Sequence, residues 1–426
     1  MRTETRRRIY CKGSPVRTDD AFWRDFSDSH WESTAAKFTG DVFAPFADPT
    51  RLFRALVRAC ELLKEGKRVP LRWSDGDNYV TPGPQAYDRL PRREDRSFEG
   101  YAERMQARTF MLHLNELQGF DTEIWDLTRA FLFDLYERVG LPVALTLCDI
   151  YVGQYRRTPF GVHLDGASNF SFGVVGKKTL YLWEPEFYHR EMKPQGAVDY
   201  RKFIEHSIPL EVGPREVIYW PSRYWHIGEP EAERFCVTMN LAVYPHTGRN
   251  RSQIVSKALA RTLETEPTDA QLVKFSRAQV AETVSGLPSV YRNVEAEIGE
   301  MCSTGALREE LARLWTERVT ALGFNVSPPL QEAPELTTDM LFTGQPNSLL
   351  AWQPSSNGRL LCSANGYSAY LPAQPQITGL LADLARGKTL SMREIMLTTG
   401  AGDLSEQAIH RLLSTLVTWR AVSVSA

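Results

Sequence analysis

The feature that most limits the fold of this chain is a block of short strand-like segments between residues 141 and 244. The segments are rich in β-branched and aromatic residues, and turn residues separate each from the next. They read ALTLCDIYVG, NFSFGVVG, KTLYLWEP, EVIYWP and FCVTMNLAVY. Strands of this length, with no helical periodicity between them, are typical of an antiparallel sandwich or barrel.

Helical patterns precede the strand block. Between Thr50 and Gly66 the apolar residues recur every three or four positions, which predicts a helix with Thr50 as its cap and Gly66 as its end. A second helix is predicted over residues 123–139 and should stop at Gly140. Residues 68–98 are rich in Pro, Gly, Asp and Arg, which predicts a long exposed connection.

Helical periodicity returns after the block. From Arg251 to Leu322 it predicts about four helices, with breaks at Pro267 and Gly286. These amphipathic helices have no obvious core partner, so we expect them to hold a homodimer together. The segment SPPLQEAPE at 327–335 is predicted to be a linker.

The last hundred residues have the pattern of a small separate unit. Helices are predicted at 376–386, 391–397 and 405–419, and Ser391 and Glu394 can form a capping box at the start of the second. A strand-like tail, AVSVSA, follows the third helix. Three short helices with strands predict a winged-helix-like domain.

The distribution of charge argues against nucleic acid or a membrane as a partner. From residue 376 onward five Lys and Arg residues stand against four Asp and Glu, and the whole chain has 50 basic and 52 acidic side chains, a net charge of -2. No positive field exists that would hold nucleic acid or anionic lipid. The longest apolar stretch, residues 141–152, contains Cys148 and Asp149 and is too short to cross a bilayer.

The cysteines and the first residues indicate the compartment. The six cysteines form no CxxC pair, which suits a reducing environment, and no apolar segment of a secretory signal follows the basic start. We therefore expect a cytoplasmic protein. The α+β pattern predicts four domains. They are an N-terminal mixed helical cap (1–100), a strand-rich domain (101–246), a helical region (247–326) and the winged-helix-like domain (327–426).

One group of residues within the strand block has the spacing of a metal site. His163 and Asp165 are two residues apart, so in a strand they point to the same side. His226, predicted on a turn after the VIYWP strand, can supply a third ligand. Two imidazoles and one carboxylate form the facial triad of non-haem Fe(II) oxygenases, which leaves coordination positions open. Each histidine taken alone is more often an ordinary residue of a sheet.

Lys178 adds a second indication. It leads into the apolar segment TLYLW, and a lysine buried there requires an anion such as the distal carboxylate of a 2-oxo acid. The alternative is a surface lysine beside Lys177.

For Arg156 and Arg157, a solvated loop is favoured over a site for an acidic peptide.

Together these residues resemble the JmjC-type 2-oxoglutarate-dependent oxygenases, in particular the factor-inhibiting-HIF-like protein hydroxylases and the ribosomal-protein oxygenases. Lys178 stands fifteen residues beyond His163, where this family has the Lys or Arg that binds 2-oxoglutarate. The family often has a Gly two residues before that Lys or Arg. Factor-inhibiting HIF has an Asn after each histidine, and the ribosomal oxygenases have a Tyr twelve residues before the first histidine. Here these positions are Gly176, Asn169, Asn240 and Tyr151.

Two positions depart from the family pattern. Asp149 stands where the ribosomal oxygenases usually have an Asn, and Pro214 follows Gly213 where the family commonly has an Asp. The specific resemblance covers residues 141–245. Beyond them, a helical dimerisation region followed by a winged helix matches the order of domains in the ribosomal oxygenases.

The resemblance implies a double-stranded β-helix (jelly-roll or cupin) fold for the catalytic domain, with Fe(II) as metal and 2-oxoglutarate and O2 as co-substrates. The implied metal ligands are His163, Asp165 and His226, and the implied co-substrate contacts are Lys178, Tyr151, Asn169 and Asn240. For the two asparagines, a role as ordinary sheet amides stays open.

The resemblance also implies the reaction. O2 cleaves 2-oxoglutarate to succinate and CO2 and leaves a ferryl species, which hydroxylates a side chain of a protein or peptide. The winged-helix-like domain could dock a leader sequence of that peptide. Three alternatives stay open: the same chemistry on a free amino acid or small natural product, a cupin metal isomerase, and a non-catalytic interaction scaffold.

Overall fold

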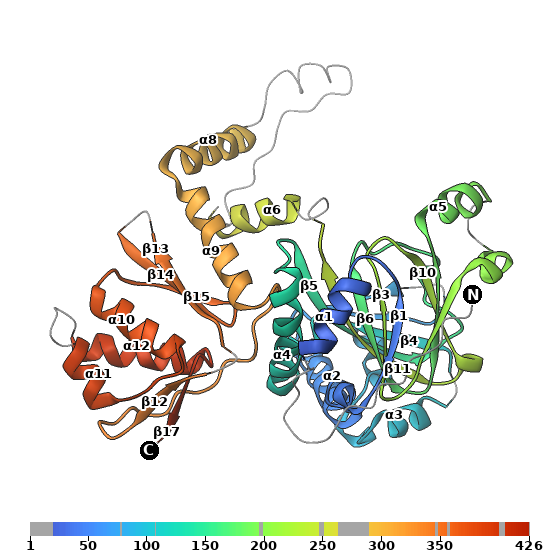
Figure 1. The fold of residues 1–426 in the computed structure, drawn as a ribbon, viewed down its shortest axis with the longest axis horizontal. Helices are drawn as coiled ribbons and strands as arrows, with labels where there is room; N and C mark the ends of the chain where they lie inside the picture. The colour runs from blue at the N-terminus through green and yellow to red at the C-terminus, as the bar shows by residue number, and fades with distance from the viewer. Residues whose placement is uncertain are drawn as a thin grey trace. The chain divides into compact units, whose positions relative to one another are not determined.

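The computed structural model describes residues 20–76, 79–106, 108–195, 199–246, 251–262, 289–345, 348–355, 358–399 and 405–425. The chain divides into two compact units, one made of residues 1–246 with 321–331 and the other of 247–320 with 332–426. In both units helices accompany antiparallel sheets (Figure 1). The predicted α+β class is therefore confirmed, whereas the four predicted domain boundaries stay predictions.

The first unit is built on two antiparallel sheets. The larger has the strand order β1-β9-β6-β11-β5-β4-β2-β3, and the smaller has the order β10-β7-β8. The larger sheet contains β1 (Ala36–Thr39), β2 (Leu71–Ser74), β3 (Tyr79–Val80), β4 (Phe110–Leu114), β5 (Leu145–Gln154), β6 (Ser168–Val175), β9 (Glu216–Trp220) and β11 (Cys236–Tyr244). The smaller contains β7 (Lys178–Trp183), β8 (Ile208–Val212) and β10 (Trp225–Pro230).

The strands β5, β6 and β11 have two chemically different faces, because successive side chains point to opposite sides. Asn240 of β11 lies opposite Asp149 of β5 and Ser171 of β6, so these buried polar residues share one face. The other face is apolar. There the ring of Phe170 lies 5.1 Å from the ring of Phe131, centroid to centroid.

The helices of the first unit cover that apolar face. Trp23 of α1 and Phe131 of α4 both pack on Phe170 of the larger sheet. The helices are α1 (Asp20–Ser29), η1 (Asp41–Ala47), α2 (Pro49–Lys64), α3 (Phe98–Met105), η4 (Leu117–Gly119) and α4 (Thr122–Val139). The hydrophobic stabilisation of the sheet therefore comes mainly from its helix-covered side, which leaves the opposite side free to be polar.

The two predicted helices exist, but one begins earlier than expected. Asp121 caps α4 by accepting hydrogen bonds from two backbone N–H groups, and α4 ends before Gly140 as predicted. The predicted cap Thr50 is wrong, because Asp48 caps α2 through the N–H of Arg51. Pro49 explains the shift, since proline fits the first position of a helix and so places the cap directly before itself.

The exposed connection predicted at 68–98 is wrong in part. This segment contains β2, β3 and the short helices η2 (Pro84–Arg89) and η3 (Arg93–Asp95), and both Leu71 and Leu90 are fully buried. One charged residue of the segment, Asp95, is paired with a residue of the following helix: Arg104 of α3 donates two hydrogen bonds to its carboxylate, at 2.5 and 2.8 Å. A satisfied carboxylate of this kind can be buried.

The connection between β7 and β8 is folded into short helices. Tyr188 stacks on Trp225 of β10, and Trp183 donates its indole N–H to the backbone carbonyl of Phe203 at 2.9 Å. These elements are α5 (Pro185–Phe187), η5 (Tyr188–Met192), η6 (Lys193–Gln195) and η7 (Tyr200–His206), and η8 (Glu231–Glu233) follows β10. Aromatic side chains of α5, η5 and η7 pack against the smaller sheet.

The second unit has two three-stranded sheets, ordered β16-β12-β17 and β13-β14-β15. Leu381 and Leu413 are completely buried in its core. The capping box predicted for Ser391 and Glu394 is confirmed, since each side chain hydrogen-bonds the other residue's backbone N–H. The helices are α6 (Arg251–Thr262), α8 (Ser289–Thr304), α9 (Ala306–Thr320), α10 (Pro375–Ala385), α11 (Met392–Thr399) and α12 (Glu406–Thr418). The strands are β12 (Leu341–Gly344), β13 (Leu350–Pro354), β14 (Arg359–Ala364), β15 (Tyr367–Pro372), β16 (Thr389–Ser391) and β17 (Val422–Ser425).

Part of the predicted helical region can be compared with the structure. The helices α6, α8 and α9 lie in it, whereas the predicted breaks at Pro267 and Gly286 lie outside the described residues. None of the helices in the described ranges combines the length and the apolar character needed to traverse a bilayer.

Replacing Phe170 by Ala should lower the free energy of unfolding of the first unit by about 3–5 kcal/mol, because it leaves a cavity between the larger sheet and the helices α1 and α4. Phe170→Leu keeps most of the apolar volume and should cost clearly less. Urea unfolding followed by tryptophan fluorescence measures both. Equal losses for the two variants would contradict this packing.

Candidate metal centre and its cavity

His163 and His226 face each other across a backbone bridge. The N–H of His163 donates to the carbonyl of His226 at 3.1 Å, and the N–H of His226 donates to the carbonyl of His163 at 2.9 Å. The bridge joins the segment between β5 and β6 to the start of β10. The turn predicted for His226 is wrong: this residue lies within β10, opposite Leu182, and the turn lies just before it at Pro221–Tyr224.

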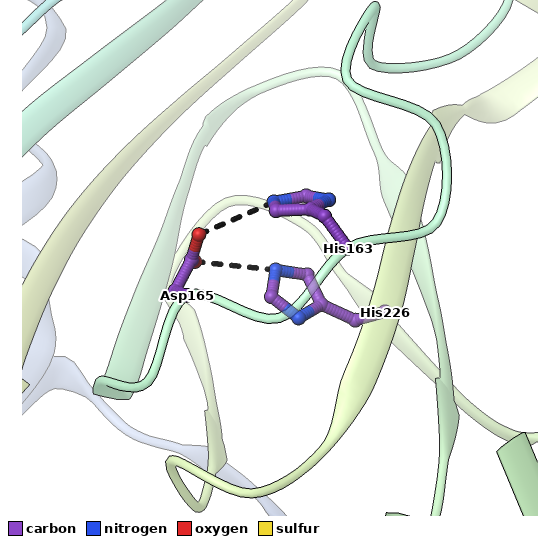
Figure 2. A group of neighbouring side chains, drawn as sticks. All are labelled: His163, Asp165 and His226. Carbon is purple, nitrogen blue, oxygen red and sulfur yellow. Dashed lines mark ion pairs between the residues drawn. The ribbon is translucent and has the colours of Figure 1, made fainter. Parts of the chain in front are cut away.

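Asp165 completes the cluster (Figure 2). Its Oδ1 lies 3.3 Å from Nε2 of His163, and its Oδ2 lies 3.3 Å from Nε2 of His226. One potential ligand atom from each of the three residues lies within 4.8 Å of the others. Within the described ranges, this is the one such group of His, Cys, Asp and Glu side chains.

The outer nitrogens of the two imidazoles determine which nitrogen faces the cluster. Nδ1 of His163 lies 3.0 Å from the carbonyl oxygen of Gly161, and Nδ1 of His226 lies 3.2 Å from that of Tyr224. A carbonyl oxygen only accepts hydrogen bonds, so each Nδ1 must carry the hydrogen. In the neutral ring, Nε2 then keeps its lone pair and is able to bind a metal.

Burial and charge tune the three groups differently. Burial would raise the pKa of Asp165, but the two neighbouring imidazoles, which donate from Nε2 and carry positive charge when they are protonated, hold it below its usual value. Burial lowers the pKa of His226, and the charge of the neighbouring His163 lowers it further. For His163 burial acts in the same direction, but the hydrogen bond and charge of Asp165 outweigh it and raise the pKa. The cluster thus holds an anionic carboxylate beside a readily deprotonated His226.

The cluster opens into a cavity of about 300 Å³, which is called the triad cavity below. One wall is the polar face of the larger sheet, with Asp149, Asn169 and Asn240, and another contains Lys178. A volume of this size suits a small ligand.

Lys178 is buried at the wall of the triad cavity. Lys178 is the first residue of β7, and it is 4% exposed. In the described part of the chain no carboxylate forms an ion pair with it. Nζ lies 4.7 Å from the ring centroid of Tyr151 and 5.9 Å from that of Tyr155. Burial lowers the pKa of Lys178 to about 8. A buried ammonium in this state is stabilised by an anionic ligand.

Gly228 of β10 makes room for that lysine. A Cβ at this position would lie 2.5 Å from Cε of Lys178, closer than two carbons can approach. The backbone N–H of Thr158 donates to the carbonyl of Gly228 at 2.9 Å and holds the strand there. The absence of a side chain at residue 228 therefore lets the ammonium extend into the cavity.

Tyr151 belongs to an aromatic group that sequence reasoning found only in part. Its ring is stacked on His113 of β4, with centroids 4.1 Å apart, and Nδ1 of His113 is hydrogen-bonded to the hydroxyl of Tyr79. All three residues line the triad cavity. The sequence holds a sign of His113 as a site residue, because a histidine stands inside the apolar segment FMLHL. It holds no such sign of Tyr79, which lies in the segment predicted to be exposed.

Asn169 and Asn240 both line the triad cavity, but their hydrogen bonding differs. Asn169 donates to the backbone carbonyl of Ala167 at 2.9 Å. The buried Oδ1 of Asn240, like Oδ1 of Asp149 opposite it, has no hydrogen-bond partner in the described part of the chain. Asn169 can therefore be an ordinary sheet amide, whereas Asn240 retains an acceptor for a ligand.

Comparisons with known proteins gave matches only among solved structures: no family model matches the sequence, and no curated protein matches it. The ribosomal oxygenase YcfD from Escherichia coli, in complex with cobalt and 2-oxoglutarate, is 15% identical over 95% of this chain and 98% of that chain, with a TM-score of 0.48. Its complex with cobalt and succinic acid gives 14% identity over the same shares and a TM-score of 0.49. The non-heme alpha-ketoglutarate-dependent epimerase SnoN from nogalamycin biosynthesis is 10% identical over 53% of this chain and 83% of that chain, with a TM-score of 0.32.

His226→Ala should weaken the binding of Co(II) by more than ~100-fold, because it removes a direct donor and the loss of even an outer partner of a ligand costs about 10–100-fold. Isothermal titration of the purified protein measures this affinity. His206→Ala, at an exposed position outside the cluster, should bind Co(II) as the unmodified chain does. Equal affinities for the two variants would exclude the cluster as the metal site.

Proposed function

We propose that this chain is an Fe(II)- and 2-oxoglutarate-dependent oxygenase that hydroxylates a side chain of a protein or peptide. The observation that carries the proposal is the presence of two complementary groups in one cavity. His163, Asp165 and His226 form a donor set with the composition of a facial triad, and Lys178 supplies a buried positive charge that has no ion-pair partner in the described part of the chain.

The donor set fits the metal. The two imidazoles keep Nε2 free because Gly161 and Tyr224 accept from their Nδ1 atoms, and Asp165 is anionic. Two neutral nitrogens and one carboxylate oxygen are the ligands that Fe(II) has in such enzymes, with further positions left open. When bound there, Fe(II) supplies the activation of O2 that oxidises 2-oxoglutarate to succinate and CO2 and the substrate to its hydroxylated form.

Lys178 is proposed to bind the distal carboxylate of 2-oxoglutarate. A charge-assisted hydrogen bond in a buried site is strong, and the ring of Tyr151 beside Nζ keeps the ammonium away from water. The hydroxyl of Tyr151 is proposed as a second donor to this carboxylate, and Asn240 as a further contact in the cavity. A cupin isomerase would leave this buried charge without a role.

The proposed architecture follows the same resemblance. The two antiparallel sheets around the triad cavity are interpreted as a double-stranded β-helix. The helices α10, α11 and α12 with the sheet β16-β12-β17 are interpreted as a winged-helix-like domain. The presence of a domain of this kind in the same chain as the catalytic unit supports a polypeptide substrate over a free amino acid.

The homodimer predicted through residues 251–322 also stays a proposal. Each of the helices α6, α8 and α9 exposes a large apolar side chain. These are Val255, Val294 and Trp315. Exposed apolar residues on adjacent helices support a second copy as the partner.

Lys178→Ala should weaken 2-oxoglutarate binding by about 10–100-fold, the equivalent of one charge-assisted hydrogen bond, without loss of metal binding. Anaerobic titration with Fe(II) and 2-oxoglutarate, followed by the charge-transfer band of the chelate, measures the affinity. Lys177→Ala is a matched control, because this neighbouring lysine is exposed and paired with Glu211 at 2.9 Å. The proposal fails if no band forms, or if both variants bind 2-oxoglutarate equally.

The affinity for 2-oxoglutarate should fall as the pH rises from 7 to 9.5. Lys178 in the free protein has a pKa of about 8, so the ammonium is present below that pH and is progressively lost above it. Each pH unit above the pKa should then reduce the affinity up to about tenfold, because binding requires uptake of a proton. The same titration in Lys178→Ala should be nearly independent of pH in this range; a matching slope in both proteins would exclude Lys178 as the titrating group.

A further inference from the structure

A second cavity, of about 350 Å³, lies in the first unit and contains three arginines. Arg156 and Arg157 come from the segment after β5, and Arg201 comes from η7. We call it the arginine cavity. The solvated loop favoured from the sequence for Arg156 and Arg157 is thus one wall of a cavity.

The two cavities share a wall. Arg156, Arg157 and Pro159 line the arginine cavity, whereas Thr158 and Phe160 line the triad cavity. The same short segment continues directly to the cluster residue His163. A polypeptide that places one side chain in the triad cavity therefore has the arginine cavity within reach of a neighbouring residue.

Positive charge exceeds negative charge around the arginine cavity. Arg201 is paired with Glu229 at 3.0 Å, and Asp199 is paired with Lys202 at 3.4 Å. Arg157 has no carboxylate partner in the described part of the chain; its guanidinium carbon lies 5.8 Å from the ring centroid of Tyr200.

The remaining arginine is only weakly neutralised. Arg156 lies 3.9 Å from Glu233, and both side chains are more than 60% exposed. An exposed pair at this distance contributes little and can be exchanged for another partner. Two guanidinium groups are thus available to an incoming anion.

A buried hydroxyl adds a second kind of donor. Tyr155 lines the arginine cavity and is 4% exposed, and its hydroxyl has no hydrogen-bond partner within the described ranges. A buried hydroxyl without a partner is costly unless a ligand satisfies it. Guanidinium and phenol donors together match a carboxylate, which arginine binds with two parallel hydrogen bonds.

We propose that the arginine cavity binds the carboxylate of an Asp or Glu residue in the polypeptide substrate. The inference rests on the proposed function for its choice of a polypeptide, and adds that the substrate is acidic near the oxidised residue. Nucleic acid is a poorer match, because Asp199, Glu229 and Glu233 lie among the arginines and would repel a phosphate backbone.

Fluorescence anisotropy with a rhodamine-labelled hexaglutamate peptide and the full chain tests this proposal. Hexaglutamate should bind at least tenfold more tightly than hexaglutamine, and Arg156→Gln with Arg157→Gln should weaken its binding at least fivefold. Arg190→Gln is the control. This exposed arginine lies in the same unit outside the arginine cavity, so its replacement should leave the affinity for hexaglutamate unchanged. The double variant should keep the Fe(II)–2-oxoglutarate band, which shows that it is folded.

The possible results separate the two proposals. Absence of hexaglutamate binding, or equal weakening by Arg190→Gln, overturns the acidic-substrate proposal while the Fe(II)–2-oxoglutarate band can still form. Tighter, arginine-dependent binding of a rhodamine-labelled six-nucleotide RNA would assign the cavity to nucleic acid and overturn it as well. If the unmodified chain forms no band, the proposed oxygenase function is refuted. Hexaglutamate binding would then show only that the cavity binds an acidic peptide, not that this peptide is a substrate.

Discussion

The two backbone hydrogen bonds between His163 and His226 are the interaction on which the rest of the site depends. They join a non-strand segment to β10 and so place two imidazoles, distant in sequence, with their ring centroids 4.3 Å apart. Asp165 stands two residues after His163, and this short distance along the chain places its carboxylate beside both rings. Because the positions come from the backbone, the cluster is assembled before any ligand arrives, and little ordering entropy is lost when one binds.

The polar side of the larger sheet comes at the expense of stability. Among the described residues, Asp149 and Asn240 each keep a buried Oδ1 without a hydrogen-bond partner, and the buried charge of Lys178 has no counterion there. Groups of this kind destabilise a fold unless a ligand compensates them. The apolar side, where Phe170 packs under α1 and α4, supplies the stability that permits this arrangement. The polar side of these strands therefore lines the candidate site, and the apolar side stabilises the fold.

Local patterns allowed much of this structure to be predicted. The five strand-like segments correspond to β5, β6, β7, β9 and β11, and the spacing of His163, Asp165 and Lys178 already indicated one cavity. What local patterns missed depends on contacts between distant segments. His113 enters the site because β4 pairs with β5, and Tyr79 enters it because β2 and β3 extend the sheet beyond β4. Likewise, the pairing of Arg104 with Asp95 buries a segment whose composition alone predicts exposure.

The wall shared by the two cavities has a thermodynamic consequence. Ligands on its two sides would contact one continuous stretch, with Tyr155, Arg156, Arg157 and Pro159 facing one cavity and Thr158 and Phe160 the other, so a shift of this stretch by one ligand would affect the other. Equilibrium then imposes reciprocity: whatever factor an acidic peptide contributes to the affinity for the oxo acid, the oxo acid contributes to the affinity for the peptide. The preference for an acidic peptide and the affinity for the oxo acid would then both depend on these six residues. Their coupling could be measured by titrating either ligand in the presence of the other.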